Sequence, residues 1–219
     1  MGISSIEQSL AIKGWMAEQE LLWLSEVALS VPKDALVVEI GSWEGRSSSA
    51  IYLSGGKNKT IISIDTWKGS PDEELHKIAQ TEDIFKLYID NMNNIGISPQ
   101  DFVRFQYGHY GVEFEWTGYS KIENGIFYLK SDSVEASKYL ADNSIDWLFI
   151  DGWHTGLKYD LDAYMPKMKK DGLLSGHDYF CFYNEIQQEI HKRFYIHGVI
   201  GNIWYKFMNV DNPPSWYKR

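Results

Sequence analysis

The chain has 219 residues, of which 44% are hydrophobic and 23% charged, and it contains a single cysteine, Cys181. A chain of this length can bury enough surface for one domain spanning residues 1–219 to fold without a disulfide or a structural metal. The formal net charge of −9 argues against nucleic acid as a partner, and the lack of a signal-peptide pattern or of a bilayer-spanning apolar run predicts a cytoplasmic protein that does not enter the membrane.

Helical segments alternate with short apolar runs along the sequence. Apolar spacing predicts an N-terminal helical segment over 5–30, which Pro32 ends. Further helices are expected at 47–53, 73–94, 133–140, 158–169 and 184–193. The apolar runs between them are typical of buried parallel strands and lie at 35–40, 60–64, 125–129, 145–150 and 172–175.

Two more predicted strands, 194–200 and 203–207, are joined by Gly201-Asn202, which favours a tight hairpin. The whole order predicts an α/β fold with a doubly wound, mostly parallel seven-stranded sheet, one antiparallel strand near an edge and an N-terminal helix. One stretch interrupts this alternation, because residues 98–124 hold seven aromatic side chains and His109. Long irregular inserts are usually functional lids or disordered, and the ring content argues for a lid.

Polar residues follow the predicted strands where each strand ends. In open α/β sheets, ligands bind beyond the carboxyl ends of the strands, so polar side chains gathered there indicate a site. Buried strands that end in carboxylates at one rim are costly unless a ligand or partner compensates them. The strand-end residues are Glu39 with Gly41, then Asp65, Asp132, Asp151 and the run Gly176-His177-Asp178.

The first strand-to-helix turn carries Gly41 and Gly45. It lacks the middle glycine of the dinucleotide fingerprint, and no Gly-Lys-Ser/Thr follows as in a phosphate-binding loop. A glycine turn beside Glu39 suits a ligand with a cationic or zwitterionic group better than one with phosphates. Asp65, about one strand–helix unit later, is placed like a carboxylate that accepts ribose hydroxyls. Taken alone, the two glycines could also be ordinary turn residues.

Several motifs in order resemble those of class I S-adenosylmethionine-dependent methyltransferases. The run 38–47 resembles their first motif and 64–67 their second. The runs 149–154 and 172–179 resemble a bacterial and phage subgroup in which Asp-Gly-x-His and Gly-His-Asp-Tyr recur, akin to small-molecule O-methyltransferases. The resemblance covers about residues 14–185, and the insert has no counterpart in it.

The resemblance implies which residues bind S-adenosylmethionine. Asp65 would accept the ribose hydroxyls, and Trp67 would lie near the ribose and adenine, although a core aromatic is an equal alternative for it. Asp132 and Ser133 would border the adenine. The methionine end would be held by Glu39, Gly41, Ser42, Trp43, Gly45 and Ser47, with Asp151 beside it.

Asp151, His154, His177 and Asp178 form the predicted catalytic group. Related O-methyltransferases hold Mg²⁺ with one carboxylate after the fourth strand and an acidic or amide pair after the fifth. Here the pair is His177-Asp178, and the histidine would shift the preference of an Asp151, His177 and Asp178 site from Mg²⁺ towards Mn²⁺, Fe²⁺ or Zn²⁺. Without a metal, His154 or His177 could act as general base. Alternatively, His177 could only cap a turn, with Asp178 as its hydrogen-bond partner.

These features predict methyl transfer from S-adenosylmethionine to a small-molecule acceptor, with oxygen as the accepting atom and a divalent metal, Mg²⁺ or Mn²⁺, as an aid. A metal-dependent hydroxylase on the same fold is one rival, with Asp151, His177 and Asp178 carrying the reaction. A non-catalytic module that binds S-adenosylmethionine is another. The N-terminal helix and exposed rings could build a homodimer.

Overall fold

The structure is a computed structural model, and it describes residues 4–71, 74–102, 124–209 and 213–217. Within these ranges, eight strands form one continuous sheet. The strands are β1 (Leu36–Ile40), β2 (Thr60–Asp65), β3 (Gln100–Asp101), β4 (Gly125–Lys130), β5 (Ile145–Ile150), β6 (Met168–Gly176), β7 (Gly198–Ile200) and β8 (Ile203–Phe207).

The strand order is β3-β4-β2-β1-β5-β6-β8-β7. The pairs from β3 to β6 are parallel, whereas β8 runs antiparallel to β6 and β7 antiparallel to β8. The predicted doubly wound, mostly parallel sheet is therefore confirmed. The short strand β3 was not expected and pairs with β4 at one edge, with Gln100 opposite Phe127. The lid predicted for 98–124 falls mostly on residues 103–123, which lie outside the described ranges.

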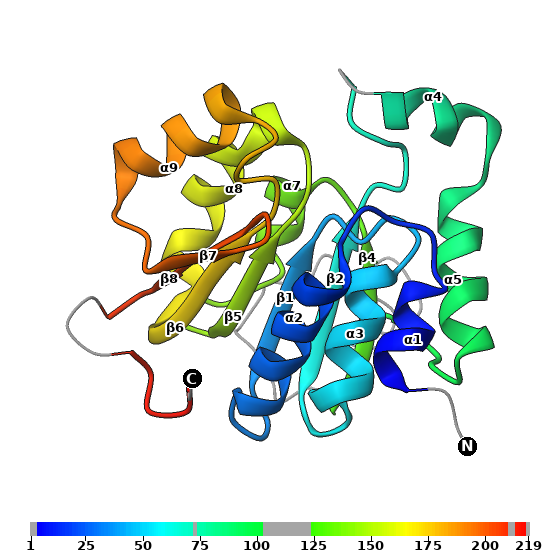
Figure 1. The fold of residues 1–219 in the computed structure, drawn as a ribbon, viewed down its shortest axis with the longest axis horizontal. Helices are drawn as coiled ribbons and strands as arrows, with labels where there is room; N and C mark the ends of the chain where they lie inside the picture. The colour runs from blue at the N-terminus through cyan, green and yellow to red at the C-terminus, as the bar shows by residue number, and fades with distance from the viewer. Residues whose placement is uncertain (1–3, 72–73, 103–123, 210–212, 218–219) are drawn as a thin grey trace, which may run out of the picture.

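Helices cover both faces of the sheet (Figure 1). The group α1, α2, α3 and α5 packs on one face, and α7, α8 and α9 pack on the other. Helix α4 lies at the rim above the carboxyl ends of the strands, and its Ile78 and Ala79 pack against the core of the first group. The helices are α1 (Ser5–Leu10), α2 (Glu18–Ser30), α3 (Arg46–Gly55), α4 (Glu74–Thr81), α5 (Ile84–Asn94), α7 (Ser133–Ser137), α8 (Leu157–Tyr164) and α9 (Gln188–Arg193).

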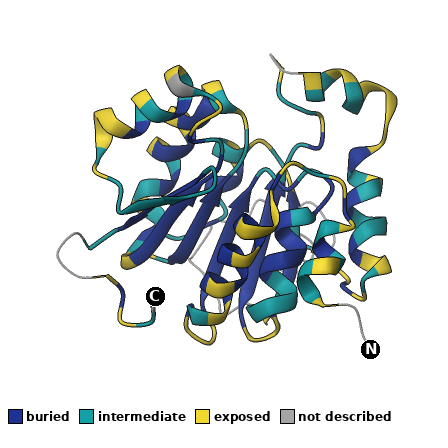
Figure 2. Ribbon diagram, viewed as in Figure 1, coloured by how far each residue is buried: buried dark blue, intermediate teal, exposed yellow. Residues whose placement is uncertain are grey.

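The central strand β1 shows why its sequence is a continuous apolar run. Val37 packs into the core that contains α2 and α3, while Leu36 and Val38 pack into the core that contains α7 and α8. All five β1 residues are buried, and Figure 2 shows the same for most of the central strands. Each fully buried Val or Leu contributes about 1.5–3 kcal/mol, so coverage on both faces stabilises the centre of the sheet where the strands end at the site.

Several predicted helices are shorter or divided in the structure. The helix predicted over 73–94 divides into α4 and α5, and the one predicted over 133–140 ends at Ser137. The N-terminal segment divides into α1 and α2, and the residues between them form a loop that includes Gly14. Helix α8 ends at Tyr164, two residues before Pro166, and a 3-10 turn (Met165–Lys167) leads directly into β6. Proline has no amide hydrogen to donate to the helical hydrogen-bond pattern, which accounts for the early end.

The described residues include no helix with the length and apolar character needed to cross a membrane.

Candidate active site

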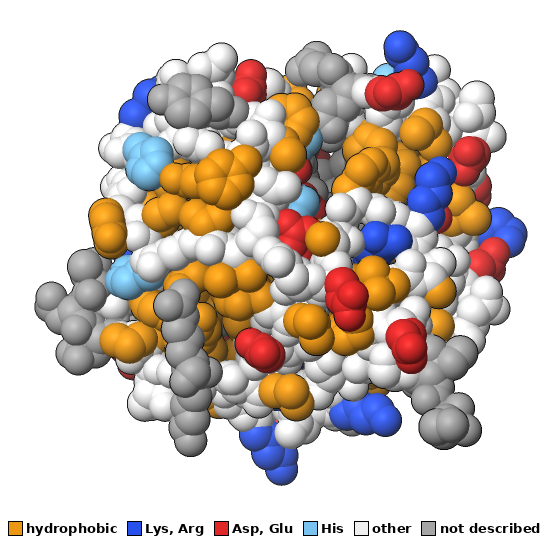
Figure 3. All heavy atoms as spheres, in the orientation of Figure 1, with side chains coloured by type: hydrophobic (Ala, Val, Ile, Leu, Met, Phe, Trp, Pro, Cys, Tyr) orange, Lys and Arg blue, Asp and Glu red, His pale blue; other side chains and the backbone are white. Residues whose placement is uncertain are grey.

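A large cleft opens above the carboxyl ends of β1, β2, β4, β5 and β6, with a volume of about 1170 Å³. Figure 3 shows a hollow on the front face, where acidic and histidine side chains lie between groups of hydrophobic side chains. The cleft is lined by most of the predicted site residues: Gly41, Ser42, Trp43, Ser47, Asp65, Asp132, Ser133, Asp151, His154, His177 and Asp178. It is also lined by two segments that the sequence motifs did not single out. One is 13–16 before α2, and the other, around the start of α4, comprises residues 68–71, 74–76 and 78.

Gly41 fixes the path of the loop after β1. Its φ is +85°, and a Cβ at this position would lie 2.1 Å from the carbonyl oxygen of Asp151. The loop after β1 therefore crosses directly over the end of β5, with room only for glycine. Its amide donates to the carbonyl of Ile64 on β2 at 2.8 Å, so one residue connects three neighbouring strand ends.

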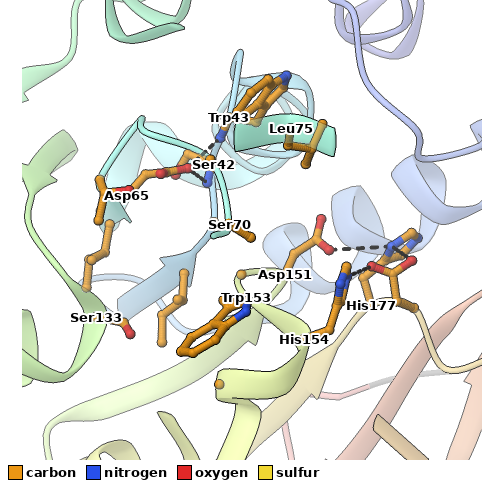
Figure 4. A pocket seen from close by; sticks show the side chains of 18 of the residues that line it. Ser42, Trp43, Asp65, Ser70, Leu75, Ser133, Asp151, Trp153, His154 and His177 are labelled. Atoms are coloured by element: carbon orange, nitrogen blue, oxygen red, sulfur yellow. Dashed lines mark hydrogen bonds and ion pairs between the residues drawn. The ribbon is translucent and has the colours of Figure 1, made fainter. Parts of the chain in front are cut away.

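Asp65 holds the same loop from the end of β2. Its Oδ2 accepts the backbone N–H groups of Ser42 and Trp43, each at 2.9 Å, and its Oδ1 accepts that of Trp67 at 2.7 Å. Figure 4 shows Asp65 directed at Ser42 and Trp43. Burial raises the pKa of Asp65, while these N–H donors oppose the rise. A carboxylate has about four acceptor sites, so a ribose hydroxyl would compete with or replace some of these bonds.

Three predicted contact residues lie behind the cleft wall instead of lining it. Glu39 is fully buried because its carboxylate accepts hydrogen bonds from four serine hydroxyls beneath the loop. Trp67 is 4% exposed and packs against Tyr88, and its indole N–H donates to the carbonyl of Trp43 at 2.8 Å. Gly45 has a φ of +98° and starts α3. The serines bound to Glu39 are Ser42, Ser47, Ser48 and Ser63.

Glu39 and Trp67 lie behind the loop that follows β1, on its core side. They support the loop from the core, and the cleft side is formed by the loop backbone. Burial raises the pKa of Glu39 even though the serine hydroxyls lower it, which reflects how far this carboxyl group lies from solvent. The structure therefore gives both residues a position that shapes the loop, and direct contact with a cofactor stays a prediction for them.

The other end of the cleft is formed by the start of α7 and by α8. Asp132 caps α7, with its Oδ1 accepting the N–H of Val134 at 3.0 Å. The hydroxyl of Ser133 donates to Oδ1 of Asp160, which is only 3% exposed and lines the cleft. Burial raises the pKa of Asp160 to about 7, although the Ser133 hydrogen bond acts to lower it. Aspartate residues on helices are usually solvated, but Asp160 is buried because α8 packs against α7.

The Asp160→Asn variant should gain stability relative to the wild type as the pH rises from 5 to 8. The pKa of Asp160 is about 7 in the folded protein against an ordinary value of 3.8, so its contribution to stability is complete below pH 4 and is lost as the pH rises through 7. About 2–3 kcal/mol of that loss falls between pH 5 and pH 8 in the wild type, and asparagine does not titrate.

Urea unfolding at both pH values measures this change. The control is Asp162→Asn on the same helix, because the Asp162 carboxylate is exposed and pairs with Arg193. An equal stability difference between Asp160→Asn and wild type at both pH values would contradict the prediction.

Asp151, His177 and Asp178 come together at the centre of the cleft floor. His177 Nδ1 lies 3.2 Å from Asp178 Oδ1 and 3.5 Å from Asp151 Oδ1. Figure 4 shows Asp151 and His177 directed at each other. One ligand atom from each of the three residues lies within 4.8 Å of the others. Two carboxylates and an imidazole in that arrangement fit a divalent cation, and the histidine favours Mn²⁺ or a later transition metal over Mg²⁺.

The positive charge of His177 and the negative charges of its carboxylate neighbours stabilise each other. Burial acts to lower the pKa of His177, but Asp151, Asp178 and Glu20 outweigh it and raise that pKa to about 12. Burial acts to raise the pKa of Asp178, but hydrogen bonds with His154 and His177 hold it well below its ordinary value. In the absence of a cation, His177 therefore carries a proton and is a poor general base.

His154 supports Asp178 from the other side. Its Nε2 lies 2.7 Å from Asp178 Oδ2, and its ring stacks on Phe182 with centroids 3.7 Å apart. Its Nδ1 is buried. In this conformation His154 orients the Asp178 carboxylate. Neither of its ring nitrogens is exposed to the cleft, because Nε2 contacts Asp178 and Nδ1 is buried.

Two residues that were not among the predicted site residues hold the N-terminal segment on the site. Arg46, which follows the glycine turn, donates to the carbonyls of Leu10, Ile12 and Met16 at 3.0, 2.6 and 2.9 Å. Glu20 lies 3.3 Å from His177 Nε2. The only local signal for Glu20 was its place three residues after Ala17 at a helix start, which indicates a cap and says nothing of His177.

Comparisons with known proteins agree with this geometry. No curated protein matches the chain at a significant level. A protein from Corynebacterium glutamicum superimposes with a TM-score of 0.58 at 14% identity, over 93% of this chain and 89% of that one. An S-adenosylmethionine-dependent O-methyltransferase from Thermotoga maritima gives a TM-score of 0.56 at 13% identity, over 90% of this chain but only 60% of that one.

A methyltransferase from Podospora anserina, solved with bound S-adenosylhomocysteine, gives a TM-score of 0.53 at 12% identity, over 80% of this chain and 61% of that one. Likenesses at these identities establish the fold. The family is established by a sequence model described as a methyltransferase domain, which matches residues 38–179, from the end of β1 through the His177-Asp178 pair. The chain therefore belongs to the methyltransferase-domain family.

Proposed function

We propose that this methyltransferase moves a methyl group from S-adenosylmethionine to an oxygen of a small-molecule acceptor, with a divalent cation held by Asp151, His177 and Asp178. The observation that carries the proposal is the position of Asp151. Its backbone carbonyl lies under Gly41 of the glycine turn, and its carboxylate faces His177. The predicted donor side and the predicted acceptor side of the cleft therefore meet at one residue.

The chain's own contribution to such a step is mainly positioning. Methyl transfer from a sulfonium is an in-line displacement, so donor and acceptor must be held at contact distance along one line. The backbone of the turn at 41–47 and the Asp65 carboxylate would hold the donor nucleoside. Asp151 and Asp178 would hold the acceptor side, with His154 fixing Asp178. A bound divalent cation would supply a clamp for acceptor oxygens and would lower the pKa of the attacking hydroxyl.

The side chains around the cleft favour a ring-bearing acceptor. Trp15, Trp43, Trp153 and Tyr159 all line it, and Trp15 is 62% exposed. Flat aromatic faces stack well on ring-shaped molecules, and the nearby carboxylates suit a molecule that carries hydroxyl groups. The Asp-Gly-x-His and Gly-His-Asp-Tyr motifs of the O-methyltransferase-like subgroup supply the residues of the proposed acceptor side.

Thermal unfolding with S-adenosylmethionine, S-adenosylhomocysteine and NAD tests the donor. Ligand at 100 times its Kd adds about 2.7 kcal/mol. At about 2–4 °C per kcal/mol for a chain of this size, both sulfur nucleosides should raise Tm by roughly 5–11 °C, and NAD should not. Transfer of labelled methyl to hydroxylated ring compounds, with Mn²⁺ or with EDTA, tests the acceptor side. A shift with NAD alone would disprove the donor assignment, and undiminished transfer in EDTA would disprove metal assistance.

A further inference from the structure

His177 is enclosed by carboxylates from three separate parts of the fold. Asp151 follows β5, Asp178 adjoins His177 after β6, and Glu20 comes from the first turn of α2. The two ring nitrogens face opposite ways, because Nδ1 lies near Asp151 and Asp178 while Nε2 lies 3.3 Å from Glu20 Oε1. The side chains of His177 and Glu20 are only 5% and 4% exposed, so Glu20 approaches His177 from the core side, away from the cleft.

The Glu20 carboxylate is itself rigidly held. Its Oε2 accepts the N–H of Ala17 at 2.6 Å, and its Oε1 accepts the N–H of Asn202 at 2.6 Å. Gly201, with a φ of +59°, leaves the space, since a Cβ there would lie 2.6 Å from Oε1. The carboxylate is thus fixed between the start of α2 and the turn that joins β7 and β8. Burial acts to raise its pKa, but His177 and the two N–H donors outweigh it and lower that pKa, so the group is ionised.

We infer that Glu20 is a positioning residue for the cation site: it accepts the Nε2–H of His177 and so keeps Nδ1 turned toward Asp151 and Asp178. The inference rests on the proposed metal assistance. A histidine ligand commonly donates its second ring N–H to a carboxylate, which fixes both the tautomer and the ring orientation, and loss of such a partner typically costs 10–100-fold in metal affinity. His177 Nε2 is buried and makes no hydrogen bond to another group among the described residues, and Glu20 Oε1 lies 3.3 Å from it as an ion-pair partner.

This assignment extends the site beyond the part of the chain that the family model matches. Glu20 lies outside residues 38–179, in α2. Two contacts hold the start of α2 in place: Arg46 donates to the carbonyl of Met16 just before it, and Asn202 of the β7–β8 turn donates to Glu20 itself. The N-terminal segment therefore contributes to the site through a buried carboxylate as well as through the residues that line the cleft.

Calorimetric titration of the full chain with Mn²⁺ tests the inference. Glu20→Gln should weaken Mn²⁺ binding 10–100-fold, whereas Glu18→Gln, an exposed residue in the same helical turn, should leave it unchanged. Asp178→Asn should abolish binding and so identify the site. Unchanged Mn²⁺ affinity in Glu20→Gln would overturn the role of Glu20 alone. No Mn²⁺ binding by the wild type would overturn metal assistance together with this inference, while the S-adenosylhomocysteine titration would still test the donor site.

A measurement on the wild type keeps the inference testable if Glu20→Gln does not fold. In the ¹H–¹⁵N spectrum of the imidazole groups with Mg²⁺ bound, the Nε2–H proton of His177 should be shifted downfield and protected from exchange, as in a hydrogen bond to a carboxylate. A purely structural role for Glu20 would not move this resonance. An Nε2–H signal at the position of an imidazole without a carboxylate partner would overturn the inference.

Discussion

Replacing Asp65 with alanine should lower the affinity for S-adenosylhomocysteine at least 100-fold, which corresponds to about 2.7 kcal/mol. The variant loses a carboxylate proposed to accept ribose hydroxyls, and hydrogen bonds to charged groups contribute about 1.5–3 kcal/mol each. It also frees the N–H groups of Ser42 and Trp43, which the Asp65 carboxylate holds at 2.9 Å. Both effects weaken the same part of the cleft, so the loss should exceed that of one ordinary contact.

Calorimetric titration of the purified variant with S-adenosylhomocysteine measures this loss. Asp90→Ala is the matched control, because Asp90 is an acidic residue on α5 whose carboxylate pairs with Lys86 at the surface. Circular dichroism should show that both variants keep the fold. An affinity for Asp65→Ala within threefold of the wild-type value would show that Asp65 only orders the loop and does not contact the nucleoside.

Replacing Asp178 with asparagine should reduce turnover by about 10³-fold and leave S-adenosylhomocysteine affinity within a few-fold of wild type. Loss of a group that assists proton removal typically costs 10²–10⁴-fold, and Asp178 is in addition a proposed cation ligand. Its carboxylate contacts His154 at 2.7 Å and His177 at 3.2 Å. Figure 4 shows these two histidines on the side of the cleft away from Asp65. A substitution at Asp178 should therefore affect turnover without affecting donor binding on the Asp65 side of the cleft.

Methyl-transfer kinetics with saturating donor measure the effect on kcat, and a parallel titration measures donor affinity. Asp171→Asn is the control, since Asp171 is an exposed residue within β6, the strand that leads to Asp178. A fall in donor affinity as large as the fall in kcat would place Asp178 at the donor site and count against the proposed division of the cleft.

The buried strands could be predicted from the sequence because strands covered on both faces appear as continuous apolar runs. Once the strands were placed in parallel order, their polar end residues had to meet at one rim, and Asp65, Asp132, Asp151 and His177 do so. The sequence does not determine a side chain's direction where that direction depends on packing. Trp67 and Glu39 follow or end strands like the others, yet their side chains turn into the core toward Tyr88 and the serines of α3.

The supporting contacts could not be predicted, because they join residues far apart in the chain. Glu20 binds the N–H of Asn202, 182 positions away, and Arg46 binds the carbonyl of Ile12, 34 positions away. Neither hydrophobic periodicity nor motif spacing in the sequence indicates such long-range pairs. The burial of Asp160 could not be predicted for the same reason. Its helical neighbours suggest a solvent-exposed face, and only the packing of α8 against α7 buries it beside Ser133.

The contact between Gly41 and Asp151 joins two backbones with no side chain between them. Because a single methyl group would not fit there, main-chain atoms directly after β1 and β5, two fully buried strands, set the spacing of the proposed donor and acceptor loops. Substitutions at the rim, at Trp15, Trp153 or Tyr159, can then change which molecule enters the cleft without changing the distance over which the methyl group travels. This separation of transfer distance from acceptor choice would let one scaffold serve many acceptors.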